Sequence, residues 1–443
     1  MKNSLLTIKI LLVCLSFFIE NGQIFAQTNS LKLSKQEKRQ VIDSVAKFMA
    51  DYYVFPKKGK EIADKIRNNH KNGDYASINN YQEFSSMLTN DLRSVNNDKH
   101  ISIRYAPEMI KRQKESSANN NDSFDKYELQ RQQNRNFGFN ELKILDGNIG
   151  YLKLNQFAYA TNGGKTAIAA MAFLANTNAI IIDLTNNGGG SPSMIQLLSS
   201  YFFDDPVHLN SFYIRKGNKT KQFWTQTTVQ GKKIPDTDIY ILTSGYTFSA
   251  AEEFTYNLKN MKRATIVGET TGGGAHPVTA YNVNDNYRVI IPYGKAINPI
   301  TKTNWEGTGV EPHVKTTKEQ ALLKAQILAL EKLIKNEPDK GKIKGYKWAI
   351  DGLRAKEHPV KIDKKLLKSY AGSYGPRKIT FENGNLFYQR AGRPKFKMIP
   401  IKKDYFGFND IAYFRLKIIK KNGKVIALEG HYDNGDSDRN EKD

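Results

Sequence analysis

Short apolar runs rich in β-branched residues recur along the middle of the chain, and helical patterns separate them. The runs are "GNIGYLKLNQF" at 147–157, "AIIIDL" at 179–184, "DIYILTS" at 238–244 and "ATIVGE" at 264–269. The first alternates like an ordinary strand, whereas the others are almost entirely apolar, as strands are when both faces of their sheet are covered. Strands that alternate with helices pack as a sheet between helical layers. The chain therefore predicts an α/β core, with boundaries at 96–318.

The segment before this core reads as helical. In residues 27–95, Ser34 and Glu37 form a helix-start pattern, and apolar residues follow at helical spacing. We expect an N-terminal helical subdomain here. Within the core, the polar segment 106–136 predicts a long surface loop or lid that is helical in part.

The segment after the core has two parts. Residues 319–365 hold a long amphipathic helix and a lysine-rich connector. In residues 366–443, alternating stretches are joined by Asn-Gly pairs, which favour tight hairpin turns. This pattern predicts a small all-β domain at the C-terminal end.

The first 26 residues have the pattern of a secretory signal peptide. Lysines accompany an apolar run that is too short to cross a bilayer, and Ala26 is a small residue suited to cleavage. Cys14, the single cysteine, lies inside that run, so the mature chain is expected to hold neither disulfide nor reactive thiol. No later segment is apolar enough for a membrane span. We expect an exported protein, periplasmic or extracellular.

The formal net charge of +23 suits anionic surroundings, such as an envelope surface or acidic polymers. Nucleic acid is not an expected partner, because the lysines are spread along the chain and no nucleic-acid-binding module is recognisable. A solvated basic surface is the simplest interpretation of this charge.

Ser249 is the first candidate for chemistry. It follows the apolar run 238–244 and precedes "AAEEFTYNLKN", a helical pattern. A hydroxyl at a helix N-terminus gains from the positive end of the helix dipole when its oxygen becomes negative. The alternative is structural, because Ser249 and Glu252 also match the capping box that begins many helices.

The glycine run 188–190 is the second candidate. It lies between an apolar strand and a helical pattern, where backbone amides are unobstructed and can bind an oxyanion or a phosphate. It matches neither the dinucleotide-binding nor the Walker pattern. The amides of Gly189 and Ala250 are the expected oxyanion donors, although a glycine run is also a common tight turn.

The order of the motifs resembles peptidase family S41, which includes the tail-specific proteases, the tricorn core and the interphotoreceptor retinoid-binding protein. The resemblance covers about Asn96 to Val314. It rests on "DKH", "GNIGYLKL", "IIIDLTNNGGG", "TSGYTFSAAEEF", "RATIVGETTGGGAHP" and "EGTGVEPHV". It implies a ClpP/crotonase-like α/β core and serine-dependent hydrolysis of a peptide or protein substrate, without a cofactor.

The resemblance also implies a choice of catalytic base. The processing proteases pair serine with a lysine, whose aligned position here is Gly274. The tricorn-like arrangement uses histidine and glutamate, and these match His100 and Glu306. Tricorn has a serine before its histidine, whereas this chain has Lys99. The peptide-binding PDZ insertion of many relatives is missing.

Other residues complete the prediction. His276 is a second candidate base, and Asp183 is expected to bind amides of the glycine loop rather than to act as an acid. No metal site is expected, because the histidines are scattered and no ligand motif is present. The predicted catalytic set is Ser249, His100 and Glu306. A catalytically inactive binder of peptides or hydrophobic ligands on the same core is the alternative.

Overall fold

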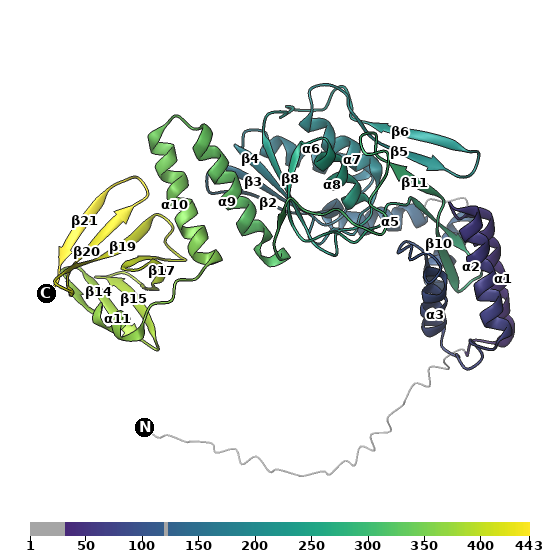
Figure 1. Cartoon of the computed structure of the whole chain (residues 1–443), viewed down its shortest axis with the longest axis horizontal. Coiled ribbons are helices and arrows are strands. Elements are labelled where there is room, and N and C mark those ends of the chain that lie inside the picture. The colour runs from purple at the N-terminus through teal and green to yellow at the C-terminus, as the bar shows by residue number, and fades with distance from the viewer. Residues whose placement is uncertain (1–31, 119–122) are drawn as a thin grey trace, which may run out of the picture.

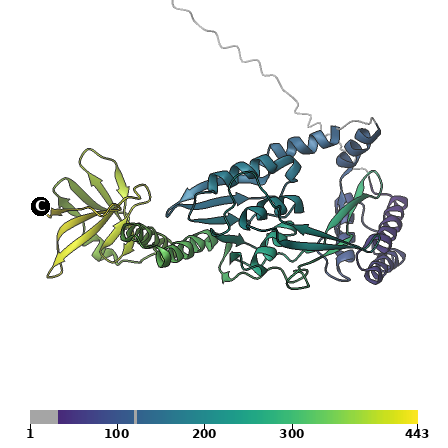
Figure 2. The ribbon, with the colours of Figure 1, turned by 90° about the horizontal axis from the view of Figure 1, so that it is seen from above.

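The computed structural model describes residues 32–118 and 123–443. The predicted signal peptide at 1–26 and Cys14 lie outside the described residues. The molecule is elongated, with helices at one end, an α/β core in the middle and β-sheets at the other end (Figures 1 and 2). This arrangement confirms the predicted fold class. None of the helices within 32–118 and 123–443 is both long and apolar enough to cross a membrane.

The core is a six-stranded sheet in the order β12-β8-β7-β4-β3-β2. Neighbouring strands run parallel except β2, which pairs antiparallel with β3. The strands are β2 (Phe139–Leu145), β3 (Ile149–Leu154), β4 (Ala179–Asp183), β7 (Asp238–Thr243), β8 (Ala264–Gly268) and β12 (Val314–Lys315).

Helices cover both faces of this sheet, as the apolar runs predict. Successive residues of a strand point to opposite faces, so Ile180 and Ile182 pack on one side and Ile181 on the other. The first face is covered by α6 (Ala160–Leu174), α7 (Pro192–Ser199) and α8 (Ala250–Asn260), and the second by α9 (Lys318–Asn336) and α10 (Lys340–Glu357). The expected lysine-rich connector after α9 thus contains a helix that helps to bury the sheet.

The N-terminal helices pack on a second, three-stranded sheet with the order β1-β10-β9. Ser34 caps the first helix by accepting a hydrogen bond from the Glu37 amide at 3.1 Å. The elements are α1 (Lys35–Tyr52), α2 (Pro56–Lys71), α3 (Tyr81–Arg93), β1 (Ser102–Tyr105), β9 (Val278–Asn282) and β10 (Tyr287–Pro292). Strands from distant parts of the sequence therefore join the helical end to the core.

The expected polar loop at 106–136 is largely helical in the structure. It contains α4 (Pro107–Ala118) and α5 (Ser123–Gln133). Lys114 forms an ion pair with Asp285, which ties α4 to the turn between β9 and β10. A further antiparallel sheet, which sequence patterns did not predict, has the order β11-β5-β6 and consists of β5 (His208–Ile214), β6 (Lys219–Trp224) and β11 (Gly294–Ile297).

The C-terminal region follows the short helix α11 (Lys364–Ser369) and holds two antiparallel sheets. Asn383-Gly384 and Asn422-Gly423 form hairpin turns with positive φ at both residues, as the Asn-Gly pairs predict. The first sheet contains β13 (Gly372–Tyr374), β14 (Arg377–Glu382), β15 (Asn385–Arg390) and β16 (Lys395–Lys397). The second contains β17 (Ile399–Lys402), β18 (Tyr405–Gly407), β19 (Phe414–Lys421), β20 (Lys424–Tyr432) and β21 (Ser437–Glu441).

Candidate active site

Ser249 lies on a sharp turn between β7 and α8. Its backbone has φ 55° and ψ −120°, a conformation that side-chain-bearing residues rarely adopt. Such strain at a strand-to-helix turn exposes the hydroxyl at the end of the sheet. Gly189 approaches so closely that a Cβ on residue 189 would lie 2.8 Å from the Ser249 Cβ. Only a glycine permits this contact between the glycine loop and the serine turn.

Glu252 holds the serine turn and a neighbouring glycine loop together. Its side chain is buried and accepts hydrogen bonds from the amides of Ser249 (2.9 Å), Gly273 (2.6 Å) and Gly274 (2.8 Å). Burial raises the pKa of Glu252, although these hydrogen bonds act in the opposite direction. The Glu252 half of the predicted capping box is therefore present, and it also positions the loop at 271–274.

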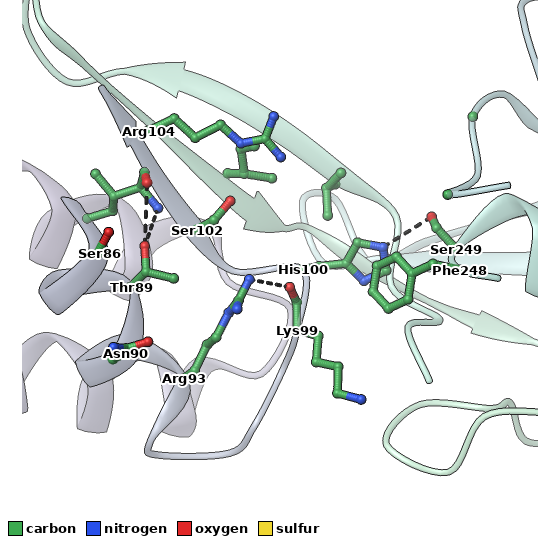
Figure 3. A pocket seen from close by; sticks show the side chains of 15 residues that line it. Ser86, Thr89, Asn90, Arg93, Lys99, His100, Ser102, Arg104, Phe248 and Ser249 are labelled. Atoms are coloured by element: carbon green, nitrogen blue, oxygen red, sulfur yellow. Dashed lines mark hydrogen bonds between the residues drawn. The ribbon is translucent and has the colours of Figure 1, made fainter. Parts of the chain in front are cut away.

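His100 faces the serine. Its Nε2 atom lies 3.1 Å from the Ser249 Oγ atom, and Figure 3 shows the ring pointing toward the hydroxyl. Asp98 accepts a hydrogen bond from the His100 amide at 3.0 Å. Arg93, on α3, donates to the carbonyl oxygens of Ile101 (2.7 Å) and Lys99 (2.6 Å). The loop that carries the imidazole is thus held from both sides.

The imidazole of His100 is 9% exposed. Burial lowers its pKa to about 4, and the nearby charge of Asp98 only partly offsets this effect. The ring is therefore neutral at pH 7 and can accept a proton. Its Nδ1 atom is buried and has no hydrogen-bond partner among the described residues.

The structure does not place Glu306 where the sequence analysis expected it. Glu306 accepts a hydrogen bond from the Ala275 amide at 2.6 Å and lies 3.5 Å from Nδ1 of His276. It does not bond His100, whose Nδ1 is unpaired. The Glu306 loop is held against 273–275 by backbone contacts, including Gly307 N–H to the Gly273 carbonyl oxygen at 3.1 Å. The expected His100–Glu306 pair is therefore absent from this structure.

His276 forms a different pair, with Asp98. The His276 Nδ1 atom lies 2.7 Å from Oδ2 of Asp98, and both side chains are buried. Burial is the largest single influence on the pKa of Asp98 and acts to raise it. The hydrogen bond from His276 and the nearby histidine charges together outweigh burial, so the pKa of Asp98 is lowered. Burial, reinforced by the charge of Asp98, raises the pKa of Glu306 to about 7. His276 thus belongs to a buried polar cluster with Asp98 and Glu306, and within the described residues it forms no hydrogen bond with Ser249.

The same three residues could in principle offer ligands to a metal ion, since one donor atom from each lies within 4.8 Å of the others. Two of these donors already hydrogen-bond each other, and Glu306 already accepts the Ala275 amide. The existing contacts of the cluster are those of a hydrogen-bonded network.

The expected oxyanion donors differ in availability. The Gly189 amide donates to the Asn187 side chain at 2.8 Å, so this N–H points into its own loop. Within the described residues, the amides of Gly190 and Ala250 have no hydrogen-bond partner, and both residues line a cavity that contains Ser249. Gly190 is accordingly a better-placed donor than Gly189, which instead provides the close contact with the serine.

Asp183 does not bind the amides of the glycine run 188–190, which the sequence analysis expected; it binds Thr185 and Tyr151 instead. Its Oδ1 atom accepts hydrogen bonds from the amide (2.9 Å) and hydroxyl (2.6 Å) of Thr185, and its Oδ2 atom accepts one from Tyr151 at 2.7 Å.

Asp98 and Asn187 were not singled out from the sequence. Asn187 is fully buried, and its carbonyl oxygen accepts the Phe248 amide at 3.1 Å. The signal for Asp98 was its position two residues before His100, where a carboxylate can accept the histidine amide.

A strained serine at a helix N-terminus, opposite a neutral imidazole and beside free backbone amides, is the active-site architecture of a serine hydrolase on an α/β sheet. Residues 148–316 match the model of peptidase family S41, and residues 23–135 match the model of the N-terminal domain of Peptidase_S41 in eukaryotic IRBP. Together these matches cover more than half of the chain. The chain belongs to peptidase family S41.

Curated relatives include a "Probable CtpA-like serine protease" of Staphylococcus saprophyticus, 25% identical over 230 residues, which are 51% of this chain and 46% of the relative. A protein with the same description in Staphylococcus epidermidis is 27% identical over 186 residues, 40% of this chain and 35% of the relative. The matched part thus spans less than half the length of these relatives.

Solved structures similar to parts of the chain include the photosystem II D1 C-terminal processing protease, with 24% identity, coverage of 39% of this chain and 43% of that chain, and a TM-score of 0.33. A lipoprotein from Streptococcus agalactiae has 17% identity and a TM-score of 0.46, and the match covers 67% of this chain and 96% of that chain. The tricorn protease has 14% identity and a TM-score of 0.41, and the match covers 72% of this chain and 37% of that chain.

Proposed function

We propose that this chain is an exported serine endopeptidase that cleaves peptide bonds through an acyl-enzyme on Ser249, with His100 as the base. The observation that carries the proposal is the 3.1 Å separation between His100 Nε2 and Ser249 Oγ at the N-terminus of α8. Free serine is a weak nucleophile at neutral pH and needs a base at this distance.

The reaction follows from the positions of these groups. Nε2 of His100 takes the Ser249 proton while Oγ attacks the carbonyl carbon of the substrate. The amides of Ala250 and Gly190 stabilise the negative oxygen that forms, a contribution on the order of 3 kcal/mol for a well-placed donor. His100 then passes its proton to the leaving amine. In the second half of the reaction, His100 takes a proton from water, the hydroxide attacks the acyl group, and Ser249 Oγ recovers the proton.

The imidazolium formed during the reaction needs a nearby negative charge. Asp98 supplies this charge from behind the ring, because it holds the His100 amide and its field raises the His100 pKa. This arrangement differs from a triad, in which the carboxylate bonds the second ring nitrogen directly. Asp98 therefore acts as a positioning residue for His100.

Serine-directed labelling tests the proposal. The full chain treated with a fluorophosphonate should become labelled on Ser249, and Ser249→Ala should abolish the label while the protein stays folded. His100→Ala should slow labelling by about 10²–10⁴-fold, which is the usual contribution of a general base. Comparison of new protein termini in cells with wild type and Ser249→Ala would then identify substrates. A folded Ser249→Ala variant that still cleaves peptides would overturn the assignment.

A non-catalytic binder of peptides or hydrophobic ligands is the second candidate. It is favoured by the unpaired Nδ1 of His100 and by the Gly189 amide, which is occupied within its own loop. Such a protein would bind ligands in the cleft but would resist the fluorophosphonate at concentrations that label serine peptidases.

The leader pattern and the net charge of +23 support the proposed export and a location beside an anionic envelope surface. Detection of the mature chain in periplasmic or culture-medium fractions, rather than in the cytoplasm, tests this part of the proposal.

A further inference from the structure

A basic cavity adjoins Ser249 and His100 on one side. It has a volume of about 610 Å³ and lies between α3, β1 and the turns that carry Gly188, Gly190 and Ser249 (Figure 3). Its cationic lining residues are Arg93, Lys99 and Arg104. No aspartate or glutamate of the described chain lines it. Three positively charged side chains therefore lie beside the reactive groups without an acidic residue among the lining.

None of these cations forms a hydrogen bond or ion pair with a carboxylate in the described part of the chain, although the charge of Asp98 acts on Arg93. Arg93 and Lys99 are held by backbone carbonyl oxygens, Lys99 by that of Gly272 at 2.6 Å. Arg104 is exposed, and its side chain has no hydrogen-bond or ion-pair partner in the described part of the chain. Cations gathered around a cavity that no carboxylate lines form a favourable site for an anion.

The strand register explains why Arg104 faces this cavity. Ser102 and Arg104 share one face of β1, and Ile290 is the β10 partner of Ser102 on the same face. Ser102, Arg104 and Ile290 line the cavity, whereas Tyr287 and Val289 belong to the core beneath the N-terminal helices. The alternation of β1 thus directs Arg104 to the cleft, whereas Ile103 is buried in the core.

The position of His100 assigns this cavity to one half of the substrate. His100 must protonate the leaving amine, so the leaving segment of the peptide passes the imidazole. His100 lines the basic cavity, whereas a second cavity of about 210 Å³, lined by Ala250, Glu253 and Trp305, meets Ser249 without contacting His100. The leaving segment therefore enters the basic cavity.

We propose that the cavity lined by Arg93, Lys99 and Arg104 selects peptides that carry a carboxylate on the leaving side of the scissile bond. The inference rests on the proposed peptidase function for the assignment of sides. The carboxylate comes either from an Asp or Glu side chain or from the C-terminal end of the peptide. Charge-assisted hydrogen bonds to arginine make such a group bind more tightly than its amide.

The test uses the full chain with Ser249→Ala, so that binding is measured without turnover. The probes are three fluorescent degenerate octapeptides: one with two Glu residues and an amidated C-terminus, one with Gln in their place and an amidated C-terminus, and one with Gln and a free C-terminal carboxylate. Fluorescence anisotropy is measured at 150 mM salt, where general attraction to a basic surface is screened.

We expect at least one carboxylate-bearing peptide to bind about tenfold more tightly than the amidated Gln peptide. Tight binding of the Glu peptide identifies the side chain as the source, and tight binding of the free-acid peptide identifies the C-terminus. Arg104→Glu should abolish the preference, and Arg104→Gln should reduce it. Arg390→Glu, an exposed arginine on β15 in the C-terminal region, provides the same charge change far from the cleft and should preserve it.

Equal affinities for the three peptides would overturn the inference, as would equal effects of Arg104→Glu and Arg390→Glu. Digestion of the same peptides by the wild-type protein shows on which side of the cleaved bond the carboxylate lies. Cleaved peptides with the carboxylate mainly on the C-terminal side of that bond support the inference. Cleaved peptides with the carboxylate only on the N-terminal side overturn the assignment of sides. Fluorophosphonate labelling of the wild-type protein is measured separately, because it tests the peptidase function independently of the anion site. Failure to label with the peptide preference intact would contradict the peptidase function but not the anion site.

Discussion

The imidazole of His100 fills the space directly beside Gly274: a Cβ on residue 274 would lie 2.7 Å from the His100 Cε1 atom. The Phe248 ring is closer still, at 2.2 Å from the same point. Position 274 is where the lysine of the processing proteases aligns. A lysine cannot begin there while His100 occupies its present position, which favours a serine–histidine pair over a serine–lysine pair.

Gly274→Ala should therefore displace the His100 ring and lower the rate of fluorophosphonate labelling by about 10²-fold, the smaller end of a general-base contribution. Gly345→Ala, in α10, is the matched control, because a Cβ there meets no atom within 4 Å. The control should label like wild type. Unchanged labelling in a folded Gly274→Ala variant would contradict the role of the His100 position.

As pH is lowered, the labelling rate should decline only at a pH well below the ordinary pKa of histidine. His100 must be neutral to accept the Ser249 proton, and burial lowers its pKa to about 4. Labelling rates should therefore stay near their maximum at pH 6 and decline only as pH falls toward about 4. The measurement is the second-order labelling rate over a pH series in which circular dichroism confirms that the fold is retained. A half-maximal rate near pH 6.5 would show that His100 is better solvated or more strongly paired than the structure indicates.

Asp98→Asn should weaken both the site and the fold. The substitution removes the charge that raises the His100 pKa and disrupts a buried pair with His276. The pH at which labelling is half-maximal should fall further, and the free energy of unfolding should fall by about 1–3 kcal/mol, as when a buried polar group loses its hydrogen-bond partner.

Tyr53→Phe is the control for Asp98→Asn, because Tyr53 donates a hydrogen bond to the same carboxylate at 3.0 Å. Loss of this single bond should cost about 0.5–1.5 kcal/mol. Denaturant unfolding and the pH profile give the two readouts. Equal pH profiles for wild type and Asp98→Asn would reduce Asp98 to a structural role.

Glu306 and Glu253 should make the fold less stable as pH rises. Burial raises the pKa of each to about 7, so the folded state holds their protons more tightly than the unfolded chain does. Their contribution to stability is full below the unfolded pKa of about 4.5 and is lost as pH rises through about 7, by up to about 1.4 kcal/mol per pH unit for each group.

The melting temperatures of Glu306→Gln and Glu253→Gln, each relative to wild type, should therefore increase between pH 4.5 and pH 7. Glu115→Gln, at an exposed position on α4, is the control and should show little change across this interval. A constant difference for both buried variants would mean that these carboxyl groups remain ionised in the folded protein.

Local patterns in the sequence were sufficient for most of the architecture. Runs such as 179–184 are apolar throughout because their strand is covered on both faces, and the Asn-Gly pairs adopt the positive φ values that their hairpins require. Ser249 was identified by its place between a strand and a helix. These features depend on neighbouring residues, and their physical causes act over a few positions. The helix at 340–357 was missed because its lysine-rich stretch resembles a linker until its buried face is seen packed on α9 and the sheet.

The sequence by itself determined the strand–helix order, the place of Ser249 between a strand and a helix, and His100 as a candidate base. Only the tertiary structure decided which carboxylate meets which imidazole, because Asp98, His276 and Glu306 are brought together by loops far apart in the chain. The tertiary structure also decided that the Gly189 amide donates to the Asn187 side chain, whereas the Gly190 amide has no hydrogen-bond partner among the described residues. Such pairings depend on how loops from distant parts of the chain pack against each other, which no local pattern encodes.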